Sequence, residues 1–261
     1  MDIKFSPNLS TMFTDSPFLE RFSRAKQCGF SSVEFQFPYD FSPADLKAIL
    51  DENKQNVVLF NLPVGNQKSG DRGLACLPDR VNEFNESVEK AMEYAQTLDC
   101  HLLNCLVGKR DEQYSLEEQL STLEMNLTRA ATKFTKHNIT LLVEHLNPFD
   151  APGFLFQSPG SVFQFLQKSS LENVKVQYDI YHAQRSEGEL TGTIEKHLPH
   201  IGHIQLADNP GRHQPGTGEI NFRFLLNRIC DFGYKGFIGL EYFPVGKSEE
   251  SFGWINEYLN L

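Results

Sequence analysis

The sequence predicts an α/β protein that folds as a single-domain (β/α)8 TIM barrel, and three observations lead to this fold class. Eight short apolar segments recur along the 261 residues, and polar or amphipathic stretches separate them. The length corresponds to about 33 residues per segment, the size of one strand–helix unit. Strands that alternate with helices indicate a parallel sheet, because parallel strands need long crossover connections.

The strand candidates are rich in β-branched, aromatic and leucine residues, as half-buried or buried strands are. In chain order they are Ile3–Leu9, Ser32–Phe37, Val57–Leu62, Leu102–Val107, Thr140–Leu146, Lys175–Ile180, His203–Ala207 and Gly236–Tyr242.

The helix candidates carry apolar residues at three- and four-residue steps, with charges on the other face. Two have clear end signals: Ser42 is an N-cap before a proline, and Gly29 is a stop. In chain order the candidates are Ser16–Cys28, Pro43–Asn53, Val81–Leu98, Leu116–His137, Ser161–Ser169, Leu190–Leu198, Phe222–Phe232 and Glu249–Leu259.

This alternation fits a closed barrel or an open doubly wound sheet, and the motifs favour the barrel. A dinucleotide-binding sheet needs Gly-x-Gly-x-x-Gly after its first strand, where this chain has Ser6–Ser10 (SPNLS). No phosphate-binding Gly-x-x-x-x-Gly-Lys-Ser/Thr occurs either. The glycine-rich stretch Asn209–Gly218 is short and lies between a strand and a helix, so it indicates a functional loop and no domain boundary. We therefore expect residues 1–261 to form one domain.

Composition and charge exclude several classes of partner. The chain has 24 Lys and Arg against 34 Asp and Glu, a net charge of −10, which repels nucleic acid and anionic membranes. No apolar run approaches the roughly 18 residues of a membrane helix, and the N-terminus lacks the pattern of a signal peptide. The five cysteines are odd in number and form no Cys-x-x-Cys pair, so we expect a reducing cytoplasm.

Each of the last four strands is apolar except for one acid or amide near its C-terminal end. These residues are Glu144, Asp179, Gln205 and Glu241, at spacings of 35, 26 and 36 residues, close to one strand–helix unit each. Because the C-terminal ends of all barrel strands open on one face, the four side chains are expected to converge.

Three carboxylates that converge in a barrel cannot be buried together unless a cation offsets their charge. Three carboxylates and one amide oxygen form a hard, oxygen-rich set of ligands. The pattern therefore predicts a divalent metal ion, Mg²⁺ or Mn²⁺ first, with Zn²⁺ or Co²⁺ as alternatives.

The same residues carry a family resemblance. The chain resembles the hydroxypyruvate isomerases and the related 2-oxo-tetronate isomerases of the xylose-isomerase-like barrel superfamily. The resemblance implies that Glu144, Asp179, Gln205 and Glu241 are metal ligands and that Glu144 and Glu241 are the paired catalytic acids. The matching stretches are FSPNLSTMF (5–13), VEFQFPYD (33–40), NLPVGNQKSGDRGLACLP (61–78), NCLVGK (104–109), QYDIYHAQRSEGELT (177–191), GHIQLADNPGRHQPGTGEINF (202–222) and GFIGLEYFP (236–244).

The implied reaction interconverts hydroxypyruvate and 2-hydroxy-3-oxopropanoate (tartronate semialdehyde) through an enediolate. One carboxylate removes a proton from carbon, and an acid or water returns one to the neighbouring carbon. The divalent ion holds both substrate oxygens and stabilises the developing charge. The sequence leaves open which glutamate is the base, and whether a hydride shift operates instead.

Three histidines near the predicted site have different expected roles. His182 follows Asp179 by three residues and is a candidate for binding a substrate oxygen. His203 is expected one layer deeper in the barrel, as a supporting residue. His145 departs from the family pattern, which has proline or a small apolar residue there, and strand alternation points it away from the pocket.

A substrate that carries a carboxylate needs a cationic clamp. Arg72, Lys109 and Arg212 follow the third, fourth and seventh strands, so all three are expected at the C-terminal face. Asn8 and Asn104 close the first and fourth strands and either line the pocket or cap a loop.

Three rival functions remain beside a small-molecule isomerase of 2-oxo or 3-oxo hydroxy acids. A 2-oxo-tetronate isomerase or sugar 3-epimerase would keep the four metal residues and differ in its loops. A metal-dependent nuclease on the same barrel would need several histidines and basic loops, whereas the strand ends here offer few histidines and the net charge is −10. A metabolite-binding protein would bind without catalysis. Barrels of this superfamily often pair, so a homodimer is one expectation for the oligomeric state.

Overall fold

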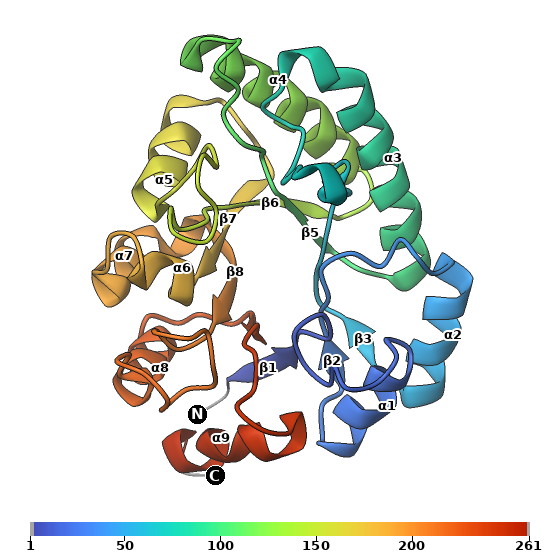
Figure 1. Cartoon of the computed structure of the whole chain (residues 1–261), viewed down its shortest axis with the longest axis vertical. Helices are drawn as coiled ribbons and strands as arrows, with labels where there is room; N and C mark the ends of the chain where they lie inside the picture. The colour runs from blue at the N-terminus through green and yellow to red at the C-terminus, as the bar shows by residue number, and fades with distance from the viewer. Residues whose placement is uncertain (1–2, 260–261) are drawn as a thin grey trace.

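The structure is a computed structural model that describes residues 3–259, and its parallel strands line the centre of a ring of helices (Figure 1). Seven strands form one sheet in the order β1-β9-β8-β7-β6-β5-β4. The first strand pairs in parallel with the last, so both ends of the chain contribute to one sheet. The strands are β1 (Lys4–Pro7), β4 (Phe60–Asn61), β5 (Leu102–Cys105), β6 (Thr140–Glu144), β7 (Val174–Asp179), β8 (Ile201–Leu206) and β9 (Phe237–Leu240).

Two short strands fill the space between β1 and β4. Strand β2 (Ser32–Val33) pairs in parallel with β3 (Asn56–Val57), and a parallel bridge between Asn8 and Glu34 joins this pair to the segment after β1. The ring therefore closes as a (β/α)8 barrel, as predicted. The predicted strand Val57–Leu62 is divided into β3 and β4, because its first half pairs with β2 and its second half with β5.

The helices cover the outside of the barrel, in agreement with the amphipathic pattern. Helix α4 shows how the sequence encodes this: Ser115 and Glu118 form a capping box at its start, and Leu123, Leu127 and Phe134 are buried against the sheet. The helices are α1 (Glu20–Gln27), α2 (Pro43–Asn53), α3 (Val81–Leu98), α4 (Leu116–Thr135), α5 (Pro159–Lys168), α6 (Ile180–Gln184), α7 (Leu190–His197), α8 (Phe222–Asp231) and α9 (Gly253–Leu259), with four short 3₁₀ helices at 67–69, 78–80, 198–200 and 248–252. In the described part of the chain, none has the length and apolar character needed to cross a bilayer.

One helix was not predicted and matters for the site. Residues after Asp179 turn at once into the five-residue helix α6, so the predicted strand Lys175–Ile180 ends one residue early. The carboxylate of Asp179 causes this turn, because its Oδ1 accepts hydrogen bonds from the backbone N–H groups of Tyr181 (2.7 Å) and His182 (3.2 Å). His182 therefore lies on a helix at the rim of the barrel and not on a strand.

Candidate active site at the C-terminal ends of the strands

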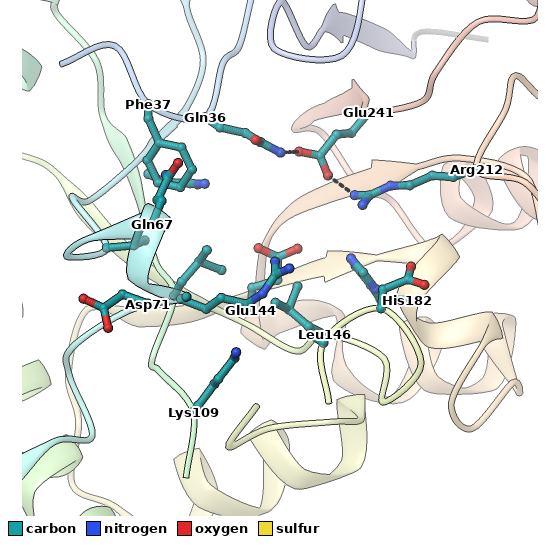
Figure 2. A pocket seen from close by; sticks show the side chains of 17 residues that line it. Gln36, Phe37, Gln67, Asp71, Lys109, Glu144, Leu146, His182, Arg212 and Glu241 are labelled. Atoms are coloured by element: carbon teal, nitrogen blue, oxygen red, sulfur yellow. Dashed lines mark hydrogen bonds and ion pairs between the residues drawn. The ribbon is translucent and has the colours of Figure 1, made fainter. Parts of the chain in front are cut away.

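A cavity of about 410 Å³ opens at the C-terminal ends of the strands, and six predicted site residues line it. Figure 2 shows Glu241 on one side of the cavity, with Glu144 and His182 across from it. Lys109 projects from a third side. The six predicted residues that line the cavity are Arg72, Lys109, Glu144, His182, Arg212 and Glu241.

The three predicted carboxylates are buried together. Glu144 ends β6, Asp179 ends β7 and Glu241 follows β9, and each is at most 5 % exposed. Burial, together with the charges of Glu241 and Asp179, raises the pKa of Glu144 well above its usual range. The raised pKa reflects the excess of negative charge that the cluster would have if all three carboxylates were ionised, as the sequence pattern predicted.

Arg212 is the cation in contact with this cluster. Its Nη2 donates to Glu241 Oε2 at 2.6 Å (Figure 2) and lies 3.4 Å from Asp179 Oδ2. Burial alone would lower the pKa of Arg212, but the charges of Glu241 and Asp179 raise it. One guanidinium does not balance three buried carboxylates, so the residues present fit a further, bound cation.

The geometry of the acids also fits a metal ion. Glu144, Asp179 and His182 each offer one ligand atom, and these atoms lie within 4.8 Å of one another. Carboxylate oxygens and imidazole nitrogens are common ligands of divalent ions. The carboxylates of Glu144 and Asp179 can thus contribute to a metal site, whereas the part of His182 depends on which ring nitrogen carries its proton.

The hydrogen bonds of His182 decide how it can act. Its Nδ1 lies 3.2 Å from the backbone N–H of Asn147 and 2.7 Å from the Asn147 side-chain Nδ2. The Oδ1 of Asn147 accepts from Phe149 and Asp150, so its Nδ2 is the donor. Nδ1 of His182 is therefore an acceptor, and in the neutral ring the proton sits on Nε2, 3.7 Å from Asp179 Oδ2. This tautomer favours His182 as a hydrogen-bond donor and not as a metal ligand.

Amides hold both catalytic candidates in place. Asn104 Nδ2 donates to Glu144 Oε2 at 2.8 Å, and Asn8 Nδ2 donates to Glu241 Oε1 at 3.1 Å. Gln36 Nε2 also donates to Glu241 Oε1, at 2.8 Å. Sequence reasoning left the roles of Asn8 and Asn104 open and missed Gln36.

Gln205 lies beneath the carboxylates, in the barrel interior. Its Oε1 accepts from Gln177 Nε2 at 2.6 Å, and its Nε2 donates to Glu34 Oε1 at 2.7 Å. His203 is completely buried next to it, one layer deeper, as predicted. Glu34 was also missed, although the VEFQF segment places polar residues at alternate positions near the end of the second predicted strand, the same signal that singled out the other strand ends.

His145 is buried behind the sheet, where strand alternation places it. Its ring lies 5.7 Å from that of Tyr178, and neither ring nitrogen has a hydrogen-bond partner among the described residues. Burial lowers the pKa of His145 to about 3, with a further contribution from the charge of His182. His145 is therefore a neutral packing residue in this structure.

The loop that carries Arg72 depends on a glycine. Gly73 has φ +112°, and a Cβ there would lie 1.8 Å from the carbonyl oxygen of Leu106. We expect Gly73→Ala to lower the free energy of unfolding by about 1–3 kcal/mol, because the clash with backbone adds to the strain at positive φ. Urea unfolding measures this loss.

Gly188→Ala is the matched control for Gly73→Ala. Gly188 also has positive φ, but a Cβ there meets nothing within 4 Å. A loss as large in Gly188→Ala as in Gly73→Ala would show that backbone strain alone, without the clash, accounts for the effect.

Fold and site together define a class of protein: a (β/α)8 barrel with a buried acidic site at the C-terminal ends of its strands. The chain belongs to the xylose isomerase-like TIM barrel family, whose sequence profile matches residues 22–258.

Individual relatives cover nearly the whole chain. The hydroxypyruvate isomerase of Escherichia coli (strain K12) is 44 % identical over 256 residues, 98 % of this chain and 99 % of the relative. The 2-oxo-tetronate isomerase of Pectobacterium atrosepticum is 38 % identical over 98 % of both chains. Among solved structures, one described as an AP endonuclease, family 2, from Brucella melitensis has a TM-score of 0.95 and 39 % identity, and covers 98 % of this chain and 99 % of that one.

Proposed function

We propose that this chain is an isomerase that interconverts hydroxypyruvate and 2-hydroxy-3-oxopropanoate. The observation that carries the proposal is the pair Glu144 and Glu241, buried on opposite sides of one cavity in a chain 44 % identical to a hydroxypyruvate isomerase. The reaction moves a carbonyl between neighbouring carbons, so it needs one group that takes a proton from C3 and one that returns a proton to C2. Two carboxylates that face each other across the substrate meet this need.

We assign Glu144, Asp179, Gln205 and Glu241 as ligands of a divalent cation, Mg²⁺ or Mn²⁺ in preference to Zn²⁺ or Co²⁺. Their oxygen-rich chemistry and unbalanced charge support this assignment. When bound, the cation would supply positive charge where negative charge develops on the substrate oxygens.

The remaining roles follow from this chain's own hydrogen bonds. His182 carries its proton on Nε2, so this N–H can donate a hydrogen bond to a substrate oxygen. The hydrogen bonds from Asn147 to Nδ1 fix the orientation of the ring. Asn104 and Gln36 hold the two glutamates so that neither can turn away from the cavity. This preorganisation reduces the structural change that the proton transfers require.

The carboxylate of the substrate needs cations that are not already paired. Arg72 and Lys109 line the cavity and form no ion pair with any residue of the described range 3–259. Arg212 already bonds to Glu241 through Nη2, but its guanidinium has five N–H groups, so donors remain for the substrate. We therefore propose that Arg72 and Lys109 bind the carboxylate and that Arg212 contacts a neighbouring oxygen.

Replacement of the unpaired cations tests this clamp. Arg72→Ala and Lys109→Ala are each expected to raise KM for hydroxypyruvate by roughly 10- to 150-fold, because a hydrogen bond to a charged group contributes about 1.5–3 kcal/mol. Steady-state kinetics measures the change. Lys68→Ala is the control, since Lys68 is exposed in the same loop and does not line the cavity. An unchanged KM in both variants would contradict the clamp.

The proposed activity is tested by ¹H NMR in D₂O with Mg²⁺. We expect hydroxypyruvate to be converted with incorporation of solvent deuterium at carbon. 2-Oxo-tetronate is the second candidate substrate, because a 2-oxo-tetronate isomerase is 38 % identical to this chain. Common ketoses in parallel samples test the sugar epimerase alternative. If none of these compounds gains deuterium or forms product, the chain is a binding protein and the proposal is wrong.

A nuclease activity is disfavoured despite the description of the Brucella structure. The net charge is −10, and His182 is the one histidine among the described residues that line the cavity. A nuclease of this barrel type would need a basic surface and a histidine-rich metal cluster. Incubation with DNA that contains an abasic site is expected to leave the DNA intact.

We also propose that residues 1–261 form one domain that works in the cytoplasm, with a homodimer as the candidate assembly. The pairing of β1 with β9 supports a single domain, because it ties the start of the chain to its end. Cys28, Cys76, Cys100 and Cys105 form no disulfide among the described residues, which supports a reducing compartment.

A further inference from the structure

Beneath the acidic cluster lies a fourth carboxylate that the proposed reaction does not use. Glu34 is completely buried in the barrel interior. A carboxylate in such a place is costly unless it is fully hydrogen-bonded, so its presence needs an explanation.

Four side chains supply donors to Glu34, two to each oxygen. Oε2 lies 2.9 Å from both Ser6 Oγ and His203 Nε2. Oε1 accepts from Gln205 Nε2 at 2.7 Å and from Asn8 Nδ2 at 3.3 Å. Gly239 on β9 leaves space for the carboxylate because it has no side chain. A Cβ at this position would lie only 2.4 Å from Glu34 Oε1. The site is thus built around a carboxylate at this position.

One of these donors, Gln205, belongs to the proposed metal site, and a second, Asn8, bonds to the proposed ligand Glu241. A carboxylate only accepts hydrogen bonds, so the amide of Gln205 must turn its NH₂ group toward Glu34. Its carbonyl oxygen then faces Gln177, and this oxygen is the atom that would contact the proposed cation. The Nδ2 of Asn8 bonds to both Glu34 and Glu241, so Glu34 also helps to place the Glu241 carboxylate.

We propose that Glu34 is a positioning residue for the metal site, which fixes the amide orientation of Gln205 and adds negative charge beneath the cation. This role rests on the proposed metal site but not on the identity of the substrate. It can therefore be tested by metal binding alone, without the isomerase assay.

The first test is Glu34→Gln in the full chain, stripped of metal and titrated with Mn²⁺ alone, with free Mn²⁺ measured by EPR. We expect the affinity to fall by roughly 10- to 100-fold, the usual effect of losing a group that orients a ligand. The charge is lost, and a glutamine at 34 permits both orientations of the Gln205 amide. Ser6→Ala is the control: it removes one donor to Glu34 and keeps the charge and the Gln205 contact, so the affinity should stay close to wild type.

The second test exchanges the two groups. Gln205→Glu alone places two carboxylates in contact and is expected to lower the unfolding temperature. In the double variant Glu34→Gln, Gln205→Glu, the amide at position 34 can donate to the carboxylate at position 205, and the net charge equals that of the wild type. We therefore expect the double variant to regain Mn²⁺ affinity that Glu34→Gln loses. The added carboxylate can itself raise the affinity, so Gln205→Glu is also titrated alone: a role in packing alone predicts the same fold-change from Gln205→Glu with and without Glu34→Gln, and the positioning role predicts a larger gain with it.

The outcomes separate the two proposals. Wild-type protein that binds no Mn²⁺ would overturn the metal site and this role of Glu34 with it. If the wild type binds Mn²⁺, two results would overturn the role of Glu34 and leave the metal site in place. One is an unchanged affinity in Glu34→Gln, and the other is a double variant that binds no more tightly than Glu34→Gln. If Glu34→Gln does not fold, the double variant compared with wild type decides: near-wild-type affinity supports the positioning role, and lost affinity overturns it.

Discussion

Glu144→Gln and Glu241→Gln are each expected to reduce the exchange of the substrate's carbon-bound hydrogen with solvent by roughly 10²–10⁴-fold. An amide in place of either carboxylate cannot take the proton from C3 or return one to C2. Both residues keep their surroundings in these variants, because glutamine has nearly the shape of glutamate and the neighbouring amides can still bond to its oxygen. ¹H NMR in D₂O, with hydroxypyruvate as substrate, measures the exchange.

Glu112→Gln is the control for the paired glutamates. Glu112 is exposed in the segment that follows β5 and does not line the cavity, so its replacement should leave the exchange unchanged. Retained exchange in both Glu144→Gln and Glu241→Gln would refute the assignment of these acids. Turnover by wild-type protein without any exchange would instead favour a hydride shift.

Removal of divalent metal with a chelator is expected to abolish turnover, and Mg²⁺ or Mn²⁺ should restore it. The same treatment should lower the unfolding temperature, because bound metal offsets the repulsion among the buried carboxylates of Glu144, Asp179 and Glu241. A cation at 100 times its Kd contributes about 2.7 kcal/mol of stability, which corresponds to roughly 5–10 °C for a chain of this size.

Differential scanning calorimetry with and without metal measures this shift. Asp179→Asn, which removes one charge from the cluster, should show a smaller difference between the two conditions than wild type. Full activity in the presence of excess chelator, together with an unchanged unfolding temperature, would contradict the metal site.

The strand-end acids could be predicted because each breaks a local pattern. Glu144, Asp179 and Glu241 stand where an apolar strand should continue, and the spacing of one strand–helix unit brings them to one face of a parallel barrel. Neither step needs knowledge of any side-chain contact. The eight strand–helix units were predictable for the same reason, since their signals are local.

Two other parts of the site were not predicted, one set by a local contact and one by a contact between distant segments. The turn into α6 comes from the Asp179 carboxylate, which caps two backbone N–H groups just after the strand. The tautomer of His182 depends on Asn147, 35 residues earlier. The Asp179 contact is local and was missed, whereas no local pattern contains the contact of His182 with Asn147.

Glu34 shows where the limit lies. By itself the sequence determined the barrel, the register of its strand ends and the excess of negative charge among them, because periodicity and residue type encode these features. Only the tertiary structure decided that Glu34 collects donors from β1, β8 and the loop after β1. Amide orientation is set by whichever partner the fold brings within hydrogen-bond distance, and that partner is far away in the sequence.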